Sequence, residues 1–121
     1  MKIKKIHIEI KSLEDTIREA GKTYEALSKG KGVKKKSGVY FSNVKDMRKA
    51  LTEKRLTMLK IIKDRKPSSI YELAKITGRD LKNVLQDLSY LNQLGIIDIV
   101  DSGNKKVPEV HYDVISFEVA I

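Results

Sequence analysis

The chain has 121 residues, of which 25 are Lys or Arg and 16 are Asp or Glu, so its formal net charge is +9. This length fits one domain, or a small domain with an added arm, and an apolar content of 40% allows a real core. The absence of cysteine excludes a disulfide framework, a thiolate metal site, an iron–sulfur cluster and a cysteine nucleophile. Because the sequence contains no run of about 18 apolar residues, we expect a soluble, cytoplasmic protein with no membrane partner.

The positive charge is concentrated in the first half of the chain. Residues 1–50 contain 14 Lys or Arg and 6 acidic residues, whereas residues 51–121 contain 11 and 10. A basic segment attracts polyanions, nucleic acid first and acidic membrane surfaces second. The alternative interpretation is a Lys-rich surface that only confers solubility, and charge alone does not separate the two.

The first elements predicted are a strand and a helix. In residues 3–11, Ile6, Ile8 and Ile10 alternate with charged residues, which is typical of a half-buried strand. Apolar residues at spacings of four and three then predict a helix over about 12–29, which Gly30 ends. The apolar stripe of this helix could form a dimer seam, although packing onto its own domain is the commoner outcome.

The next segment, Lys29 to Gly38, reads KGKGVKKKSG and is predicted to be a mobile loop. Its functional interpretation is a basic arm in which Lys34, Lys35 and Lys36 contact phosphates. The alternative is a solvated linker. We therefore divide the chain into an N-terminal strand-helix extension with a basic loop, residues 1–38, and a second domain, residues 39–121.

Helical patterns dominate residues 43–94. A helix capped by Ser42 or Asn43 is predicted over about 43–65, with Thr52 as a second cap that could divide it. Ser69 and Glu72 form a capping box for a helix that ends near Gly78. Asp80 caps a third helix that reaches Gly95, and its predicted buried stripe is Leu81, Val84, Leu85, Leu88 and Leu91.

Strand patterns follow Gly95. Strands are predicted over Ile96–Val100 and Val107–Val114, joined by a turn at residues 101–106. The apolar parity then slips by one residue, which predicts a bulge or bend near Val114–Ile115 and a separate last strand. We expect this last strand to pair with strand 3–11.

Three helices followed by a β-hairpin predict an α+β fold, a winged helix-turn-helix with a strand-helix extension at its N-terminus. Ala74, Gly78 and Val84 occupy positions 5, 9 and 15 of the helix-turn-helix pattern. These positions need a small residue where the helices cross, a positive φ in the turn, and a β-branched residue facing the core. Two positions depart from the pattern, because Arg79 replaces an apolar residue and Leu88 comes one place late.

The motifs LTEKRLTMLKII, SIYELAKITGRDLKNV and DLSYLNQLGII carry a family resemblance over about residues 41–100. This part of the chain resembles predicted winged-helix transcriptional regulators of archaea and bacteria, related to the MarR and ArsR type. The resemblance implies double-stranded DNA as the partner. Some members resemble antitoxins encoded beside a toxin, which adds a toxin protein to the candidate partners.

In that fold the recognition helix is residues 80–94, and its N-terminal turns read base edges in the major groove. The predicted DNA-contacting residues on or just before it are Arg79, Lys82, Asn83, Gln86, Ser89 and Tyr90. The amides of Asn83 and Gln86 match adenine N6 and N7, while Lys82 or Arg79 can reach guanine or a phosphate. The alternative is that these polar side chains are simply solvated.

The wing would be residues 101–106, with Lys105 and Lys106 placed to approach the DNA backbone or minor groove. The recognition helix contributes no net charge, because Asp80 and Asp87 balance Arg79 and Lys82. Lys34, Lys35 and Lys36 are therefore expected to supply much of the attraction to phosphate.

No motif in the sequence indicates an enzyme, a cofactor or a metal site. His7 and His111 are the only histidines, and neither has ligand spacing. The leading hypothesis is a homodimeric, sequence-specific DNA-binding regulator, with either helix 12–29 or the terminal strands forming the two-fold contact. The alternative is a protein-interaction module built on a winged helix, such as an antitoxin.

Overall fold

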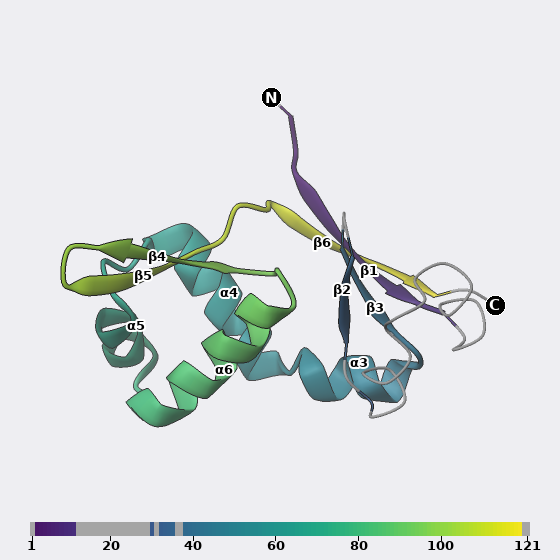
Figure 1. The fold of residues 1–121 in the computed structure, drawn as a ribbon, viewed down its shortest axis with the longest axis horizontal. Coiled ribbons are helices and arrows are strands. Elements are labelled where there is room, and N and C mark those ends of the chain that lie inside the picture. The colour runs from purple at the N-terminus through teal and green to yellow at the C-terminus, as the bar shows by residue number, and fades with distance from the viewer. Residues whose placement is uncertain (1, 12–29, 31, 36–37, 120–121) are drawn as a thin grey trace. The chain divides into compact units, whose positions relative to one another are not determined.

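The structure is a computed structural model that describes residues 2–11, 30, 32–35 and 38–119. The described part of the chain is an α+β protein with four helices and two sheets (Figure 1). It forms two compact units: unit 1 comprises residues 1–52 and 112–121, and unit 2 comprises residues 53–111. The predicted helix over 12–29 lies outside the described residues.

A four-stranded sheet forms unit 1, in the order β2-β3-β1-β6. Its strands are β1 (Lys5–Ile10), β2 (Val33–Lys35), β3 (Gly38–Phe41) and β6 (Val114–Val119). Strand β1 runs parallel to both β3 and β6, whereas β2 is antiparallel to β3. The predicted pairing of the first and last strands is confirmed, with a register from Lys5 opposite Val114 to Ile10 opposite Val119.

The core of unit 1 follows the alternation seen in the sequence. Ile6, Ile8 and Ile10 are all buried, as their period-2 spacing predicts. In the parallel register, Val39 lies beside Ile8 and Phe41 beside Ile10, and both neighbours are also buried. One face of β1 and β3 therefore carries a continuous apolar layer.

Gly38 allows β3 to approach β1 closely. It lies opposite His7 in the register, and a Cβ atom built on it would collide with the backbone carbonyl of His7. Because a backbone carbonyl cannot rotate away as a side chain can, only glycine fits this position.

The prediction of a loop over residues 29–38 is wrong for its central part. Val33–Lys35 form strand β2, which pairs with β3 from Val33 opposite Tyr40 to Lys35 opposite Gly38. Backbone hydrogen bonding to an existing strand does not depend on local composition, so a lysine- and glycine-rich segment can still complete a sheet. Lys34 and Lys35 consequently lie on an edge strand, while Lys36 lies outside the described residues.

The long helical segment is divided, as the cap at Thr52 suggested. Helix α3 (Val44–Ala50) belongs to unit 1, and α4 (Glu53–Arg65) belongs to unit 2. The Asn43 side chain caps α3 by accepting a hydrogen bond from the Asp46 backbone N–H at 2.8 Å. In the described residues, the boundary between the units is thus at residue 52, after β2, β3 and α3, whereas the sequence analysis placed it at residue 38.

Unit 2 contains α4, α5 (Ile70–Thr77), α6 (Leu81–Gln93), and a hairpin of β4 (Asp98–Ser102) and β5 (Lys105–Glu109). The predicted caps are present, with Ser69 before α5, Gly78 after it and Asp80 before α6. The buried side chains are contributed by all three helices and by the segment before β4: Met58, Leu59, Ile62, Leu73, Ala74, Val84, Leu88, Leu91, Ile96 and Ile97.

Two details of unit 2 differ from the prediction. Leu81 and Leu85 were assigned to the buried stripe of α6, but their side chains are 37% and 45% exposed. They lie at the margin of the apolar stripe, where helical periodicity alone does not decide burial. The hairpin turn is also shorter than predicted, since only Gly103 and Asn104 separate β4 from β5. Strand β5 ends at Glu109, so the predicted break before the last strand falls at residues 110–113.

Candidate nucleic-acid interface

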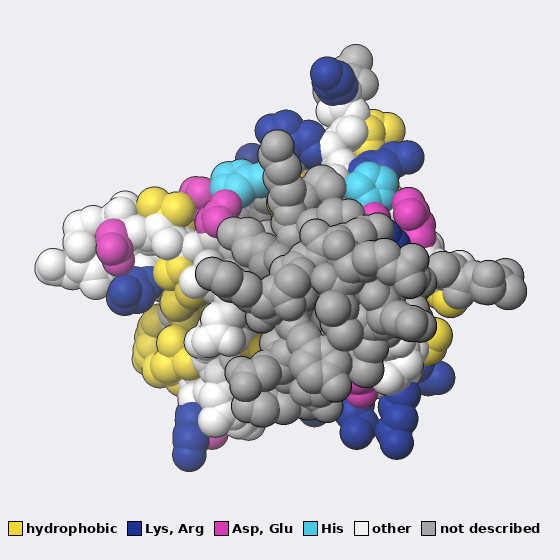
Figure 2. All heavy atoms as spheres, turned by 45° about the vertical axis from the view of Figure 1, so that its right-hand side comes forward, with side chains coloured by type: hydrophobic (Ala, Val, Ile, Leu, Met, Phe, Trp, Pro, Cys, Tyr) yellow, Lys and Arg dark blue, Asp and Glu magenta, His cyan; other side chains and the backbone are white. Residues whose placement is uncertain are grey.

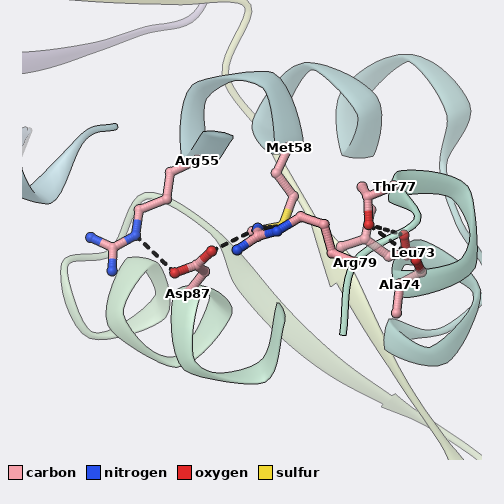
Figure 3. A network of polar contacts seen from close by, with 7 residues as sticks. All are labelled: Arg55, Met58, Leu73, Ala74, Thr77, Arg79 and Asp87. Carbon is pink, nitrogen blue, oxygen red and sulfur yellow. Dashed lines mark hydrogen bonds and ion pairs between the residues drawn. The ribbon is translucent and has the colours of Figure 1, made fainter. Parts of the chain in front are cut away.

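The turn between α5 and α6 is built by a glycine in the left-handed conformation. Gly78 has φ 65° and ψ 24°, and its N–H bonds to the Lys75 carbonyl. The N–H of Arg79 bonds to the Ala74 carbonyl at 3.2 Å, which completes a Schellman motif. The Thr77 hydroxyl lies within hydrogen-bonding distance of the Leu73 and Ala74 carbonyls and adds a side-chain donor at the end of α5 (Figure 3).

A partly buried carboxylate connects α6 to the rest of unit 2. Asp87, with only 13% of its side chain exposed, forms an ion pair at 2.7 Å with Nη1 of Arg79 from the turn. Its other oxygen accepts a hydrogen bond at 3.1 Å from Nε of Arg55 on α4. Figure 3 shows the two guanidinium groups on either side of the carboxylate. Three segments of unit 2 are thereby connected through one side chain.

This arrangement changes the interpretation of two predicted DNA contacts. Arg79 is held by Asp87 and also contacts the Met58 sulfur at 3.8 Å, so its guanidinium is occupied inside the protein. The ring of Tyr90 is covered by the guanidinium of Arg55, at 4.8 Å from its centroid. The contacts of Arg79 and Tyr90 therefore favour a role in holding α6 in place. Arg79, which stands where the helix-turn-helix pattern has an apolar residue, has Asp87 as its partner inside unit 2.

The outward surface of α6 carries the other predicted contacts. Lys82, Asn83, Gln86 and Ser89 are all exposed. Leu81 and Leu85 are partly exposed on the same helix, so this surface combines amide, ammonium, hydroxyl and apolar groups. The apolar component was missed in the sequence because both leucines were assigned to the core.

The charge of α6 is also more favourable to an anion than its composition suggests. The carboxylate of Asp87 is compensated by Arg55 and Arg79 together, which leaves one positive charge in that cluster. Asp80 is used as the N-cap, where its side chain accepts a hydrogen bond from the Lys82 N–H. Unit 2 as a whole contains 11 Lys or Arg and 8 acidic residues.

Helix α5 adds an exposed aromatic residue that the sequence analysis did not select. The side chain of Tyr71 is 60% exposed, and the ammonium of Lys75, one turn further along, lies 4.7 Å from its ring centroid. A tyrosine and a lysine at spacing i, i+4 share one helix face. The periodicity of α5 places both residues outside the core, and this was the available signal.

The start of α5 brings the hairpin close to the helices. Ser69 caps α5 by accepting from the Glu72 N–H at 3.0 Å, whereas the Glu72 carboxylate accepts from the hydroxyl and N–H of Ser68. In the predicted capping box, Glu72 would accept a hydrogen bond from the Ser69 N–H. In the structure it accepts from Ser68, one residue earlier. These two hydrogen bonds from Ser68 lower the pKa of Glu72, and the nearby charges of Lys105 and Arg65 lower it further.

The hairpin presents both predicted lysines to solvent. Lys105 and Lys106 are exposed on β5, on either face of the strand because they are adjacent. Lys106 lies opposite Asp101 in the register and forms an exposed ion pair with it at 3.5 Å. Lys105 lies opposite Ser102 instead, and its charge acts on the Glu72 carboxylate.

Unit 1 contains a second basic surface, on α3. Lys45, Arg48 and Lys49 are exposed and, together with Val44, line an open hollow of about 490 Å³. Figure 2 shows Lys and Arg side chains in dark blue at the margins of one face of the molecule. The i, i+3, i+4 spacing of these three cations was the signal that the sequence analysis left unused.

Among the described residues, no group of three or more His, Asp or Glu side chains is arranged so that it could hold a metal ion. His111 lies 3.1 Å from Asp98 and 3.5 Å from Glu109, and His7 lies 3.3 Å from Glu118. In the part of the chain that the structure covers, no helix is both long and apolar enough to cross a membrane.

Comparison with known families gives a match over the second half of the chain. The family model HVO_A0114 matches residues 50–117, which is more than half of the chain. The chain belongs to the HVO_A0114 family. The part shared with the HVO_A0114 family includes all of unit 2 and extends into β6. Neither a curated protein nor a solved structure matches the chain.

Proposed function

We propose that unit 2 is a winged helix-turn-helix that binds double-stranded DNA and that the protein is a transcriptional regulator. The observation that carries this proposal is the fixed α5–α6 pair, whose second helix exposes Lys82, Asn83 and Gln86 on its first turns. The first turns of a recognition helix are the part that reaches base edges. The resemblance to winged-helix regulators of the MarR and ArsR type supports the same assignment.

In this proposal the α6 surface provides direct readout. Asn83 and Gln86 donate to and accept from adenine, and Lys82 contacts guanine or a phosphate. Leu81 and Leu85 supply apolar surface for thymine methyl groups, a role that their partial exposure permits. Arg79 and Tyr90 act indirectly, because their contacts with Asp87 and Arg55 hold the helix in place.

Contacts to the phosphate backbone come from the hairpin and from α5. Lys105 and Lys106 are exposed on β5, and Tyr71 and Lys75 are exposed on α5. These side chains carry hydroxyl or ammonium donors that suit phosphate oxygens. The modest charge of unit 2 makes additional attraction from the basic unit 1 necessary, and Lys34, Lys35 and Lys36 remain the candidates.

The salt dependence of duplex binding tests this assignment. Each phosphate that is neutralised contributes about 0.9 to the slope of log affinity against log salt concentration. Replacing Lys105 and Lys106 by Ala should reduce the slope by up to about 1.8, whereas replacing the exposed Lys54 and Lys60 of α4 removes the same charge and should change it less. Equal slopes for the two double variants would remove the hairpin from the interface.

A second function is supported by one specific observation. Leu81 and Leu85 expose apolar surface on α6, which also suits a protein partner such as the toxin of a toxin–antitoxin pair. In that case Leu85→Ala should weaken capture of a protein partner and leave duplex binding unchanged. In the DNA-binding protein, the same substitution should weaken duplex binding at sites that contain the contacted thymine.

A further inference from the structure

The two edges of the sheet in unit 1 are chemically different. Strand β2 forms one edge and contributes Lys34 and Lys35, and charged residues on an edge discourage pairing with another chain. Strand β6 forms the other edge with the sequence VISFEV. It contains no Lys, Arg, Pro or Gly, and Glu118 is its only charged residue, so it has few of the usual features that protect an edge.

The side chains of β6 are also less covered than those of the strand beside it. In the register, Phe117 lies beside Ile8 and Val119 beside Ile10 on the same face of the sheet. Ile8 and Ile10 are 0% and 6% exposed, whereas Phe117 and Val119 are 47% and 54% exposed. The apolar face of the sheet therefore continues onto β6, where its side chains are exposed.

We propose that a second copy of this chain binds at this edge, through antiparallel pairing of β6 with the β6 of the partner around a two-fold axis at Phe117. The pairing joins two four-stranded sheets into one continuous sheet. It does not depend on DNA binding by unit 2.

The sequence of β6 is complementary to itself in this register. Phe117 faces its own copy, and Ile115 faces Val119, so the apolar side chains of both strands share one face. On the other face Ser116 lies opposite Glu118, which places a hydroxyl donor beside each carboxylate.

Two kinds of alternative register satisfy the strand less well. A two-fold axis at Glu118 would set two carboxylates against each other, which is destabilising for directly opposed residues. An axis between two residues would place apolar side chains opposite polar ones, because side chains alternate between faces. A closed two-fold contact of this kind uses the same patch on both subunits, as isologous dimers do.

Engineered cysteines test the register directly, because the chain contains no cysteine of its own. Phe117→Cys should give a disulfide-linked dimer on mild oxidation, since directly opposed Cα atoms in an antiparallel pair are about 4.5–5.5 Å apart and a disulfide spans this distance. Val114→Cys, on the same strand and 41% exposed, is the matched control. Its two copies would lie roughly 20 Å apart along the strands and should not cross-link.

The oligomeric state, measured by sedimentation or light scattering, is the second test of the proposed dimer. The unmodified chain should be a dimer, and Phe117→Lys should raise the dimer dissociation constant by at least about tenfold. Tyr71→Lys, at a more exposed aromatic site on α5, should leave the dimer intact. A monomeric parent, a dimer that survives Phe117→Lys with unchanged circular dichroism, or equal cross-linking of both cysteine variants would overturn the proposal.

Discussion

Asp87 connects α6 to two other segments of unit 2. Its two oxygens contact Arg79 and Arg55, which come from the α5–α6 turn and from α4. With 13% of the carboxylate exposed, removing its charge would leave two guanidinium groups close together without compensation. The orientation of α6 therefore depends on this residue, although it would touch no DNA.

Replacing Asp87 by Asn keeps the shape of the side chain but removes the negative charge that compensates Arg55 and Arg79. This change should destabilise unit 2 by about 2 kcal/mol. Urea unfolding of the full chain, followed by circular dichroism, measures the change. The combination of Asp87→Asn with Arg79→Gln should cost less than the sum of the two single changes. Strict additivity would show that the two side chains do not interact in solution.

Gly78 is constrained by its backbone and not by its surroundings. Its φ of 65° is unfavourable for residues with a Cβ, while an added Cβ would meet no atom within 4 Å. Gly78→Ala should therefore lower the free energy of unfolding by roughly 1–2 kcal/mol. Gly78→Asn should cost less, because Asn tolerates the left-handed region. Equal losses in the two variants would contradict a purely conformational cause.

At the scale of elements, the start of α5 should make stability depend on pH. The pKa of Glu72 is lowered by hydrogen bonds from Ser68, so the folded state favours the ionised carboxylate. The resulting stabilisation is present above the pKa of the unfolded chain and is lost as the pH falls through the lower folded pKa.

Unfolding of the parent and of Glu72→Gln, measured from about pH 7 to about pH 3, tests this dependence. The variant should be less stable than the parent at neutral pH, and the difference should shrink in acid. Ser68→Ala should behave like Glu72→Gln, because it removes the hydroxyl that donates to the carboxylate. A difference that is constant with pH would mean that Glu72 acts by some route other than its charge.

The elements that local sequence could predict are those that local chemistry determines. The caps at Asn43, Ser69, Gly78 and Asp80 were identified because a cap depends on residues within one helical turn. Strand β2 was missed because its stability comes from pairing with β3 and not from its own lysine-rich composition.

The candidate site shows the same limit. The exposed amides of α6 followed from helical periodicity, but the contact of Asp87 with Arg55 did not, because these two residues are 32 positions apart in the chain. The exposure of Leu81 and Leu85 was also missed, since it depends on which neighbours pack beside α6. Side-chain partners from distant segments become visible only in the three-dimensional structure.

For the molecule as a whole, most of the net charge lies in unit 1, whereas the proposed recognition helix lies in unit 2. Unit 1 contains 14 Lys or Arg and 8 acidic residues. In the proposed function, unit 2 selects the sequence and unit 1 contributes attraction that is independent of sequence.

Replacing Lys34, Lys35 and Lys36 together by Ala should therefore lower the salt slope of duplex binding by up to about 2.7 and leave sequence preference intact. The matched control is Ala at Lys2, Lys4 and Lys5, three exposed lysines of the same unit. Identical slopes for the parent and the first triple variant would remove these lysines from the interface.

The central claim is that the first turns of α6 read DNA sequence, and selection of binding sites from a random duplex pool tests it most directly. Asn83→Ala combined with Gln86→Ala should relax the preference by about 1–3 kcal/mol at the contacted base pairs. Asn92→Ala combined with Gln93→Ala, which removes the same amides from the far end of the helix, should select the same sites as the parent. If the parent and both double variants select one common site, or if the parent selects none, α6 is not a recognition helix.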